Sequence, residues 1–242
     1  MRSKISSGAV RMTSADRAAI RRLLGDVEIT PLGAGLDHRA YAVGDQLVAR
    51  CGEGVEREAA LLDAIAPRLP LPVPEPVILG HGAIIQRRIP GRPLLELARA
   101  QRARFVPELL AFVEAVHALA VDAEVDDTPP AAWLDELPDG HGLIAPEPAT
   151  TLTFIHGDLG AEHVFVDGDR ITGVLDWGDA AIGDPAIDHG RLLRDFGAPD
   201  HPRARFYALA TALEDLDYGV PLYRENALAA LAALGHPAAT DP

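Results

Sequence analysis

The stretch Phe154–Asp184, FIHGDLGAEHVFVDGDRITGVLDWGDAAIGD, decides the fold of this chain of 242 residues. Within it, Val164–Val166 and Ile171–Leu175 are short runs rich in β-branched residues, which favour strands. Asp167-Gly168-Asp169 lies between the two runs, and an Asp-Gly pair in that position is a strong signal for a tight turn. The sequence therefore predicts an antiparallel β-hairpin here.

One acidic motif precedes this hairpin and another follows it. Antiparallel pairing returns the chain past His163 by about three residues, roughly 10 Å of strand. This carries Asp176 alongside the loop that holds Asp158. Phosphoryl transfer from a nucleotide uses two such carboxylates, because one receives the proton of the attacking hydroxyl and another holds the metal that bridges the phosphates. The hairpin therefore indicates a phosphoryl-transfer site.

The order of the motifs resembles the core of the aminoglycoside phosphotransferase family, relatives of the protein kinases. His156-Gly157-Asp158 is followed by four residues and His163, then by Asp176-Trp177-Gly178 and by Gly183–Asp188. The resemblance implies an α+β, two-lobed, protein-kinase-like fold. A small N-terminal lobe with an antiparallel sheet, residues 1–88, would bind the nucleotide. A larger, mostly helical C-terminal lobe with the catalytic hairpin, residues 89–242, would carry catalysis and the acceptor site.

The resemblance also implies a role for each motif residue. Asp158 would accept the hydroxyl proton, and Asp176 would ligate Mg²⁺ bound with ATP or GTP. His156 and Asp188 would brace the catalytic loop. His163 stands where the family usually carries Asn; it would assist the metal, although Mg²⁺ takes imidazole poorly. A histidine at the start of a strand, bonded to nearby backbone, is the alternative interpretation of His163.

The N-terminal third offers a strand, a glycine-containing loop over Pro31–His38 and a second strand, as in kinases where such a loop covers the phosphates. Lys4 is the one lysine of the chain, so an Arg must replace the phosphate-binding Lys of kinases. Glu56 competes with Glu58 as the partner of Arg50, and an Arg50 that faces water from a strand edge is a further alternative. The residues that the resemblance assigns to the nucleotide are Gly33, Gly35, Arg50, Glu58, Gln86 and Arg88.

Several helices are expected from caps and apolar spacing. Ser14 is the expected N-cap of the first one. Their ranges are Ala15–Leu24, Val106–Leu119, Arg203–Leu216 and Arg224–Leu234.

Composition predicts a soluble enzyme. No apolar run approaches the roughly 18 residues of a membrane span, and the first residues lack the apolar segment of a secretory signal. We therefore expect a cytoplasmic protein without membrane contact, and a monomer. The formal net charge of −14 argues against a nucleic-acid partner. Cys51 is the one cysteine, which excludes an internal disulfide and favours a buried, inert thiol.

The acceptor is the least determined part. The resemblance favours an aminoglycoside or similar antibiotic, and an acidic protein would attract such a cationic small molecule. Macrolides, cyclic peptide antibiotics, amino alcohols and sugars remain as alternative acceptors, and a non-catalytic nucleotide-binding protein remains as an alternative function. A protein kinase is disfavoured because no Ala-Pro-Glu follows Asp176. The candidates for acceptor binding, which a merely solvated acidic face also explains, are Asp126, Asp127, Asp135, Glu136, Glu214 and Asp217.

Overall fold

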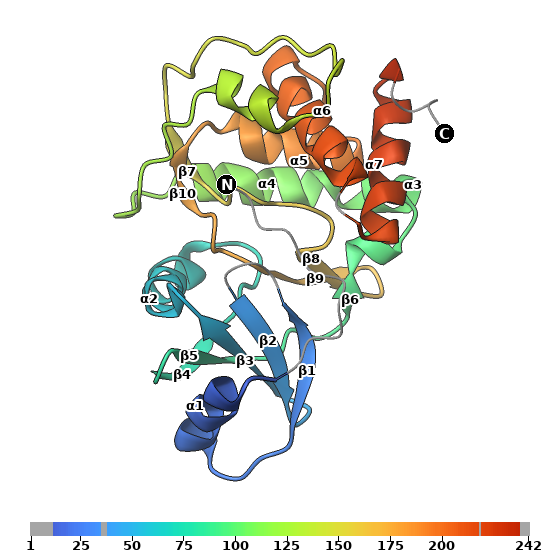
Figure 1. Cartoon of the computed structure of the whole chain (residues 1–242). Coiled ribbons are helices and arrows are strands. Elements are labelled where there is room, and N and C mark those ends of the chain that lie inside the picture. The colour runs from blue at the N-terminus through green and yellow to red at the C-terminus, as the bar shows by residue number, and fades with distance from the viewer. Residues whose placement is uncertain (1–11, 35–37, 218, 238–242) are drawn as a thin grey trace. The chain divides into compact units, whose positions relative to one another are not determined.

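The computed structural model describes residues 12–34, 38–217 and 219–237. Two compact units divide the chain (Figure 1). Unit 1 takes in the chain up to Arg68 together with Pro72–Pro90, and unit 2 takes in Leu69–Leu71 and the chain from Gly91 onward. Unit 1 is an antiparallel sheet with two helices and unit 2 is mostly helical, which confirms the predicted α+β, kinase-like class.

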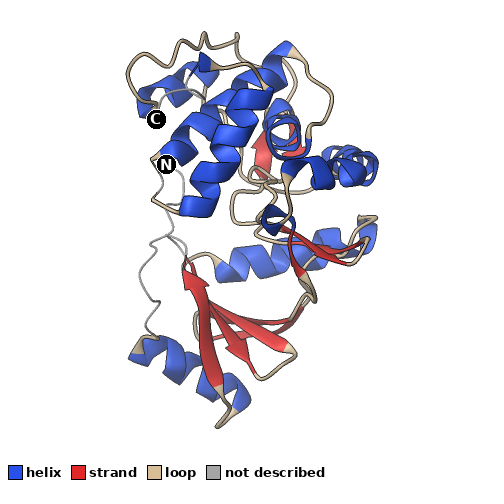
Figure 2. Ribbon diagram, turned by 90° about the vertical axis from the view of Figure 1, so that its right-hand side faces the viewer, coloured by secondary structure: helices blue, strands red, loops and turns tan. Residues whose placement is uncertain are grey.

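The sheet of unit 1 has five strands in the order β1-β2-β3-β5-β4, and each neighbouring pair is antiparallel. Its helices are α1 (Ser14–Leu24) and α2 (Val55–Ile65). The strands, drawn in red in Figure 2, are β1 (Ile29–Ala34), β2 (His38–Val43), β3 (Leu47–Gly52), β4 (Pro76–Gly80) and β5 (Ala83–Arg87).

Alternation along the strands gives each helix its own face of the sheet. Ile85 packs in the same cluster as Ile20 of α1, whereas Ile84 packs with Val55 of α2. Successive side chains of a strand point to opposite faces, so β5 is buried on both sides. The same rule places Cys51 in the α1 cluster, and burial raises the pKa of this thiol to about 11. The expected buried thiol is therefore confirmed.

Two local predictions in unit 1 are wrong. Thr13, not Ser14, is the N-cap of α1, because its hydroxyl accepts a hydrogen bond from the Asp16 N–H at 3.0 Å. The expected loop over Pro31–His38 is partly strand: β1 continues to Ala34, and Gly33 pairs with Ala40 after an irregularity in register. Gly35 lies outside the described residues.

Unit 2 holds two small antiparallel sheets, with the strand orders β6-β8-β9 and β10-β7. Their strands are β6 (Arg92–Pro93), β7 (Thr153–Ile155), β8 (Val164–Asp167), β9 (Arg170–Val174) and β10 (Ala181–Gly183). The helices are α3 (Arg99–Arg102), α4 (Val106–His117), α5 (Ala186–Phe196), α6 (Pro202–Leu216) and α7 (Pro221–Ala233). Short 3-10 turns cover Ala66–Arg68 in unit 1, and Leu94–Glu96, Ala103–Phe105 and Pro130–Glu136 in unit 2.

The helix boundaries of unit 2 follow local chemistry. Proline begins α6 and α7 at Pro202 and Pro221, where its missing N–H costs nothing. Gly197 ends α5 in the left-handed conformation, with φ 74°. One core cluster joins α5, α6 and α7 around Leu193, Leu213 and Leu231. This packing fixes α5, the helix on which the site below depends.

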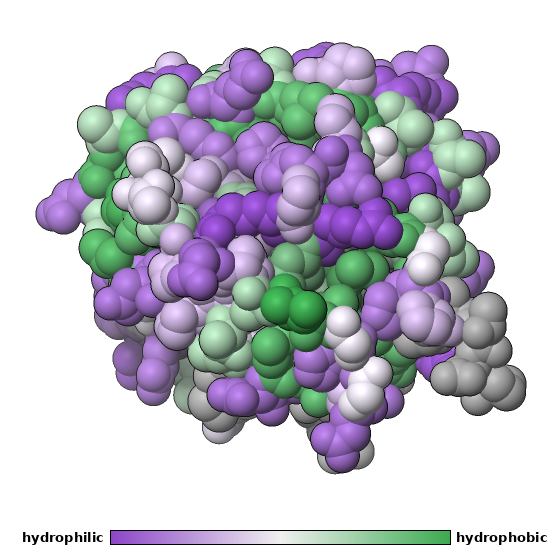
Figure 3. Space-filling view, turned by 90° about the horizontal axis from the view of Figure 1, so that it is seen from above, coloured by the Kyte–Doolittle hydropathy of each residue, from purple (hydrophilic) through white to green (hydrophobic). Residues whose placement is uncertain are grey.

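No helix among the described residues is long and apolar enough to cross a membrane. The face seen in Figure 3 mixes hydrophilic and hydrophobic residues, with a hydrophilic band running across it.

Candidate active site

The predicted hairpin β8–β9 forms, but its register differs from the expected one: the chain returns past His163 by one residue at Asp176, not by about three. Val164 pairs with Val174 and Asp167 with Arg170, across a bulge next to Phe165. Beyond the strand, the Leu175 N–H donates to the His163 carbonyl at 2.8 Å. The chain that leads to Asp176 therefore returns alongside the end of the loop that carries Asp158.

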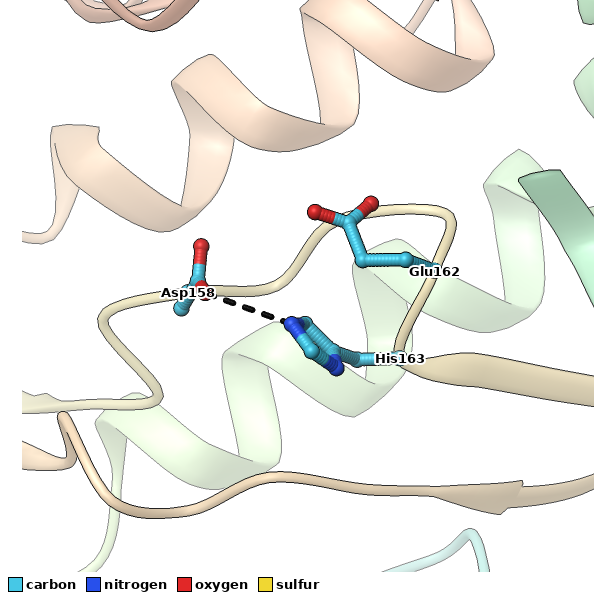
Figure 4. Close-up of side chains that lie close together, drawn as sticks. All are labelled: Asp158, Glu162 and His163. Carbon is cyan, nitrogen blue, oxygen red and sulfur yellow. Dashed lines mark hydrogen bonds and ion pairs between the residues drawn. The ribbon is translucent and has the colours of Figure 1, made fainter. Parts of the chain in front are cut away.

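Asp158 lies within a small group of possible metal ligands. Its Oδ2 is 3.2 Å from His163 Nε2 (Figure 4, dashed line). Among the described residues, ligand atoms of Asp158, Glu162 and His163 all lie within 4.8 Å of one another. Figure 4 shows Glu162 on the same loop, with one oxygen of Asp158 turned toward His163 and the other turned away.

The backbone of this loop is held by Asp188 at the start of α5. Asp188 Oδ2 accepts from the His156 N–H at 3.0 Å, and its Oδ1 accepts from the Gly157 N–H at 2.9 Å. His117 Nε2 of α4 lies 3.0 Å from Asp188 Oδ2. Burial alone would raise the pKa of Asp188, but these hydrogen bonds, led by the one from His117, bring it below its usual value. A charged Asp188 thus joins the loop to two helices.

The imidazole of His156 is buried, and both of its ring nitrogens contact backbone groups. Its Nε2 lies 3.0 Å from the Leu175 carbonyl, and its Nδ1 accepts from the Asp158 N–H at 3.3 Å. Burial lowers the pKa of His156 to about 4, against the attraction of Asp188. His156 is therefore neutral at pH 7 and links the Asp158 loop to the chain after β9.

Two positions of the site have backbone conformations that favour glycine. Gly157 has φ 85°, and a Cβ there would collide with the Asp179 carbonyl, so no larger residue fits. Asp176 has φ 61°, which for a non-glycine residue is uncommon but is tolerated by Asp more than by most residues. Such conformations concentrate at functional sites, where the surrounding structure imposes them.

A line of charged residues on α5 faces the same loop. Asp188, Arg191 and Asp195 are spaced by three and four residues, which puts them on one helix face. Arg191 forms an ion pair with Asp158, and its Nη2 lies 3.7 Å from Glu162 Oε1. Asp195 Oδ2 accepts from the backbone N–H of Ala161 at 2.8 Å.

Arg194, on the same helix, makes its closest ion pairs with Asp195 and Asp215. Its Nε lies 2.7 Å from Asp195 Oδ1 and its Nη1 lies 2.8 Å from Asp215 Oδ2. Burial would raise the pKa of Asp195, but the Arg194 guanidinium holds that pKa well below its usual value. Burial raises the pKa of Glu162, against the attraction of His163 and Arg194.

The sequence predictions missed the supporting residues Glu162, Arg191, Arg194 and Asp195. The sequence carries a signal for them, because charged residues recur at helical spacing after Asp188, with apolar residues between them in the same helix. Such a face is usually solvated, so the sequence did not separate a buried ionic face from an exposed one.

In unit 1, Arg50 forms an ion pair with Glu58, and the side chains are 11% and 3% exposed. His38 Nδ1 lies 3.2 Å from Arg50 Nη2, and His38 Nε2 lies 2.7 Å from the Glu53 carbonyl. Arg50 therefore does not face water from a strand edge, and its partner is Glu58 rather than Glu56.

The remaining nucleotide candidates differ in environment. Gln86 is buried on β5, and within the described residues its Nε2 has no hydrogen-bond partner. Arg88 is exposed, and its backbone N–H donates to the Gln46 carbonyl at 2.8 Å. Gly33 lies in β1, with open space where a side chain would stand.

The acidic acceptor candidates are spread along unit 2. Asp126 lies on the segment that pairs with β10, through its N–H to the Ile182 carbonyl at 2.9 Å. Asp135 and Glu136 are exposed on the turn whose Trp133 packs on Tyr207 of α6. Glu214 is seven residues further along α6, roughly 10 Å of helix. Asp127 and Asp217 are exposed.

A cavity of about 380 Å³ opens beside the starts of α5 and α6. None of the six acidic candidates lines it. Its lining residues are Glu147–Thr151, Asp184–Ala186, His189, His201 and Arg203.

Comparison with known proteins agrees with this fold. Residues 28–222 match the sequence model of the Phosphotransferase enzyme family. A stretch of 54 residues is 44% identical to viomycin phosphotransferase of Streptomyces vinaceus, but it spans only 21% of this chain and 19% of that protein.

Solved structures match over most of their length. The GDP and kanamycin complex of APH(2'')-IIIa has a TM-score of 0.62 at 19% identity, over 90% of this chain and 88% of that one. The macrolide 2'-phosphotransferase MphH from Brachybacterium faecium has a TM-score of 0.55 at 24% identity, over 88% and 85%. The chain therefore shares the kinase-like fold of these structures. The chain belongs to the Phosphotransferase enzyme family.

Oxygen ligands of the kind that Mg²⁺ prefers lie around His163. Asp158 and Glu162 form a group with His163, and among the described residues this group does not include Asp176, the metal ligand expected from the sequence. His163 turns Nε2 toward Asp158, so Nδ1 is the ring nitrogen left for a metal-bound water or a cation. Asp176 follows Leu175, whose backbone is bonded to His163.

Proposed function

We propose that this protein transfers the terminal phosphate of ATP or GTP to a hydroxyl group of a small molecule. The observation that carries the proposal is the hydrogen bond between Leu175 and His163, which joins the segment leading to Asp176 to the loop of Asp158. The two carboxylates thereby stand on neighbouring segments, as phosphoryl transfer requires.

In this reaction Asp158 orients the acceptor hydroxyl and receives its proton. The acceptor oxygen forms a bond to the terminal phosphorus, and the bond from that phosphorus to the bridging oxygen breaks, which releases the nucleoside diphosphate. Asp158 contributes mainly by positioning, because the transition state is loose. His156 and Asp188 hold the loop in place.

Asp176 and His163 would hold Mg²⁺, which when bound neutralises charge on the phosphates. Arg50, fixed by Glu58, would contact the phosphates, with Gly33 and Gly35 along them. Gln86 and Arg88 lie at the segment proposed to meet the base. The buried Nε2 of Gln86, which has no hydrogen-bond partner within the described residues, supports this assignment, since a bound base would offer it an acceptor.

For the acceptor we propose an aminoglycoside or a similar antibiotic, so that the enzyme would confer resistance by inactivation. The support is the set of matched proteins, whose names include viomycin, kanamycin and macrolide enzymes. The six acidic candidates would attract a cationic acceptor electrostatically. An amino alcohol or sugar is the alternative acceptor class. We further propose a soluble, cytoplasmic monomer without membrane contact. The formal net charge of −14 supports the absence of a nucleic-acid partner.

The test is a phosphorylation screen of antibiotics and amino alcohols with Mg²⁺ and either ATP or GTP, read by product mass. Asp158→Ala and Asp176→Ala should each abolish product while the thermal unfolding curve stays cooperative. Asp169→Asn is the matched control, because Asp169 lies at the hairpin turn and pairs with exposed Arg104. Substantial turnover by either alanine variant would overturn the assignment, and nucleotide binding without any product would favour a non-catalytic protein.

A further inference from the structure

We propose that Arg191 of α5 is a positioning residue, which holds one oxygen of Asp158 so that the other faces the acceptor hydroxyl. The inference rests on the proposed function, because it assigns Asp158 the role of proton acceptor. Arg191 touches Asp158, not the reacting atoms, and it acts through that carboxylate.

The contacts of Asp158 divide between its two oxygens. Oδ1 forms the ion pair with Arg191, and Oδ2 lies 3.2 Å from His163 Nε2. Figure 4 shows one oxygen turned toward His163 and the other away from it. A carboxylate gripped at Oδ1 cannot rotate freely, so Oδ2 keeps one direction.

Burial makes this ion pair a constraint rather than a surface contact. The Arg191 side chain is 9% exposed, and a guanidinium at such a position needs a nearby negative charge. Glu162 is a weaker partner, because its Oε1 lies 3.7 Å from Arg191 Nη2. Of these two carboxylates, Asp158 is therefore the closer to Arg191.

The neighbouring guanidinium cannot replace Arg191. Arg194 forms ion pairs with Asp195 at 2.7 Å and with Asp215 at 2.8 Å. Its distance to Glu162 is longer, at 3.8 Å. The cation that reaches Asp158 is thus supplied by one position of α5.

The same helix fixes both the backbone and the side chain of the catalytic loop. Asp188 holds the N–H groups of His156 and Gly157, and Arg191 follows it by three residues, about one helical turn. Helix α5 therefore holds Asp158 at two points, through the backbone before it and through its side chain. A misplacement of about 1 Å at a reacting group can cost about a hundredfold in rate.

The first measurement compares turnover of Arg191→Gln and Arg191→Lys with the wild type, using the best acceptor of the screen. We expect kcat of Arg191→Gln to fall about a hundredfold, as for a misplaced reacting group. The KM for nucleotide should change much less than kcat, and Arg191→Lys should recover part of the rate because it keeps the charge. Arg104→Gln, which removes an exposed Arg–Asp pair at the hairpin turn, is the control. Wild-type kcat in Arg191→Gln would overturn the inference, as would an equal loss in the lysine variant and in the glutamine variant.

The second measurement does not depend on turnover. Thermal unfolding is recorded for Asp158→Asn, Arg191→Gln and the double variant. If the two side chains hold each other, the double variant should lose less Tm than the sum of the single losses, because neither charge is then left alone. Additive losses would overturn the inference even if the enzyme is active. Absence of product from the wild type, together with non-additive losses, would instead overturn the proposed function and leave the held carboxylate supported.

Discussion

The Asp188 carboxylate accepts the backbone N–H of Gly157 at 2.9 Å, across 31 residues of sequence. Its other oxygen accepts the N–H of the preceding residue, His156, at 3.0 Å. One buried side chain therefore determines where the peptide before Asp158 lies.

Replacing Asp188 with Asn should damage both stability and turnover. The amide can offer one acceptor oxygen at most, so one of the buried N–H groups of His156 and Gly157 faces a donor. Leaving such a group unsatisfied costs about 1–3 kcal/mol. We expect a lower Tm and a kcat reduced more than the nucleotide KM is raised. Asp169→Asn is the matched control, and an unchanged kcat in Asp188→Asn would show that the loop does not depend on this carboxylate.

Gly157→Ala should be much more harmful than the same change at Gly168. Both glycines have positive φ, 85° and 60°, but a Cβ at Gly157 meets the Asp179 carbonyl whereas a Cβ at Gly168 meets open space. Gly168→Ala should cost only the strain of the left-handed conformation, about 1 kcal/mol. Gly157→Ala should in addition shift the loop and abolish product. Chemical denaturation and the product assay, run on both variants, decide the comparison; similar behaviour of the two would contradict it.

His156 should make the protein less stable as the pH falls. Its pKa is about 4 in the folded state, against the ordinary 6.5, so the unfolded state binds more protons between these values. The free energy of unfolding is therefore unaffected by His156 above pH 6.5 and falls below it, by about 2 kcal/mol at pH 5. Urea unfolding of wild type and His156→Gln should show their difference shrinking by that amount from pH 7.5 to pH 5. His81→Asn, at an exposed turn, should leave the profile of the wild type unchanged; a constant difference for His156→Gln would refute the prediction.

Arg50→Ala should weaken nucleotide binding and destabilise unit 1. The change removes the proposed phosphate contact and leaves Glu58, 3% exposed, without its guanidinium. We expect at least a tenfold rise in the nucleotide dissociation constant, in line with loss of a charge-assisted contact, measured by calorimetry beside thermal unfolding. Arg87→Ala is the matched control, because its pair with Glu75 spans 3.4 Å and both side chains are more than two-thirds exposed. Equal effects of the two variants would contradict a special role for Arg50.

The sequence predicted those parts of the site that depend on residues close together in the chain. The Asp-Gly turn and the β-branched runs predicted the hairpin that brings the segment of Asp176 back to His163, because pairing in a short hairpin has few alternatives. The bulge next to Phe165 was not predicted, so the expected return of about three residues past His163 is one residue in the structure. The kinase-like class followed from the same motifs. The α5 ion pairs could not be predicted, since burial of Arg191 and Asp195 depends on how α5 packs against distant residues.

The same distinction explains the two local errors in unit 1. Thr13 and Ser14 are adjacent and both suit an N-cap, so composition could not choose between them. Strand β1 runs on through Pro31 because its partner β2 pairs with Gly33 and Ala34, a tertiary contact that glycine content does not reveal.

The single thiol of the chain gives a way to watch one half of the protein alone. Cys51 is buried in the sheet of unit 1, and its raised pKa disfavours the reactive thiolate. A thiol reagent should therefore modify Cys51 only when that sheet opens. Unit 2 has no cysteine, so it does not contribute to the labelling. The labelling rate with and without nucleotide would thus report how strongly a ligand closes unit 1, without any introduced probe.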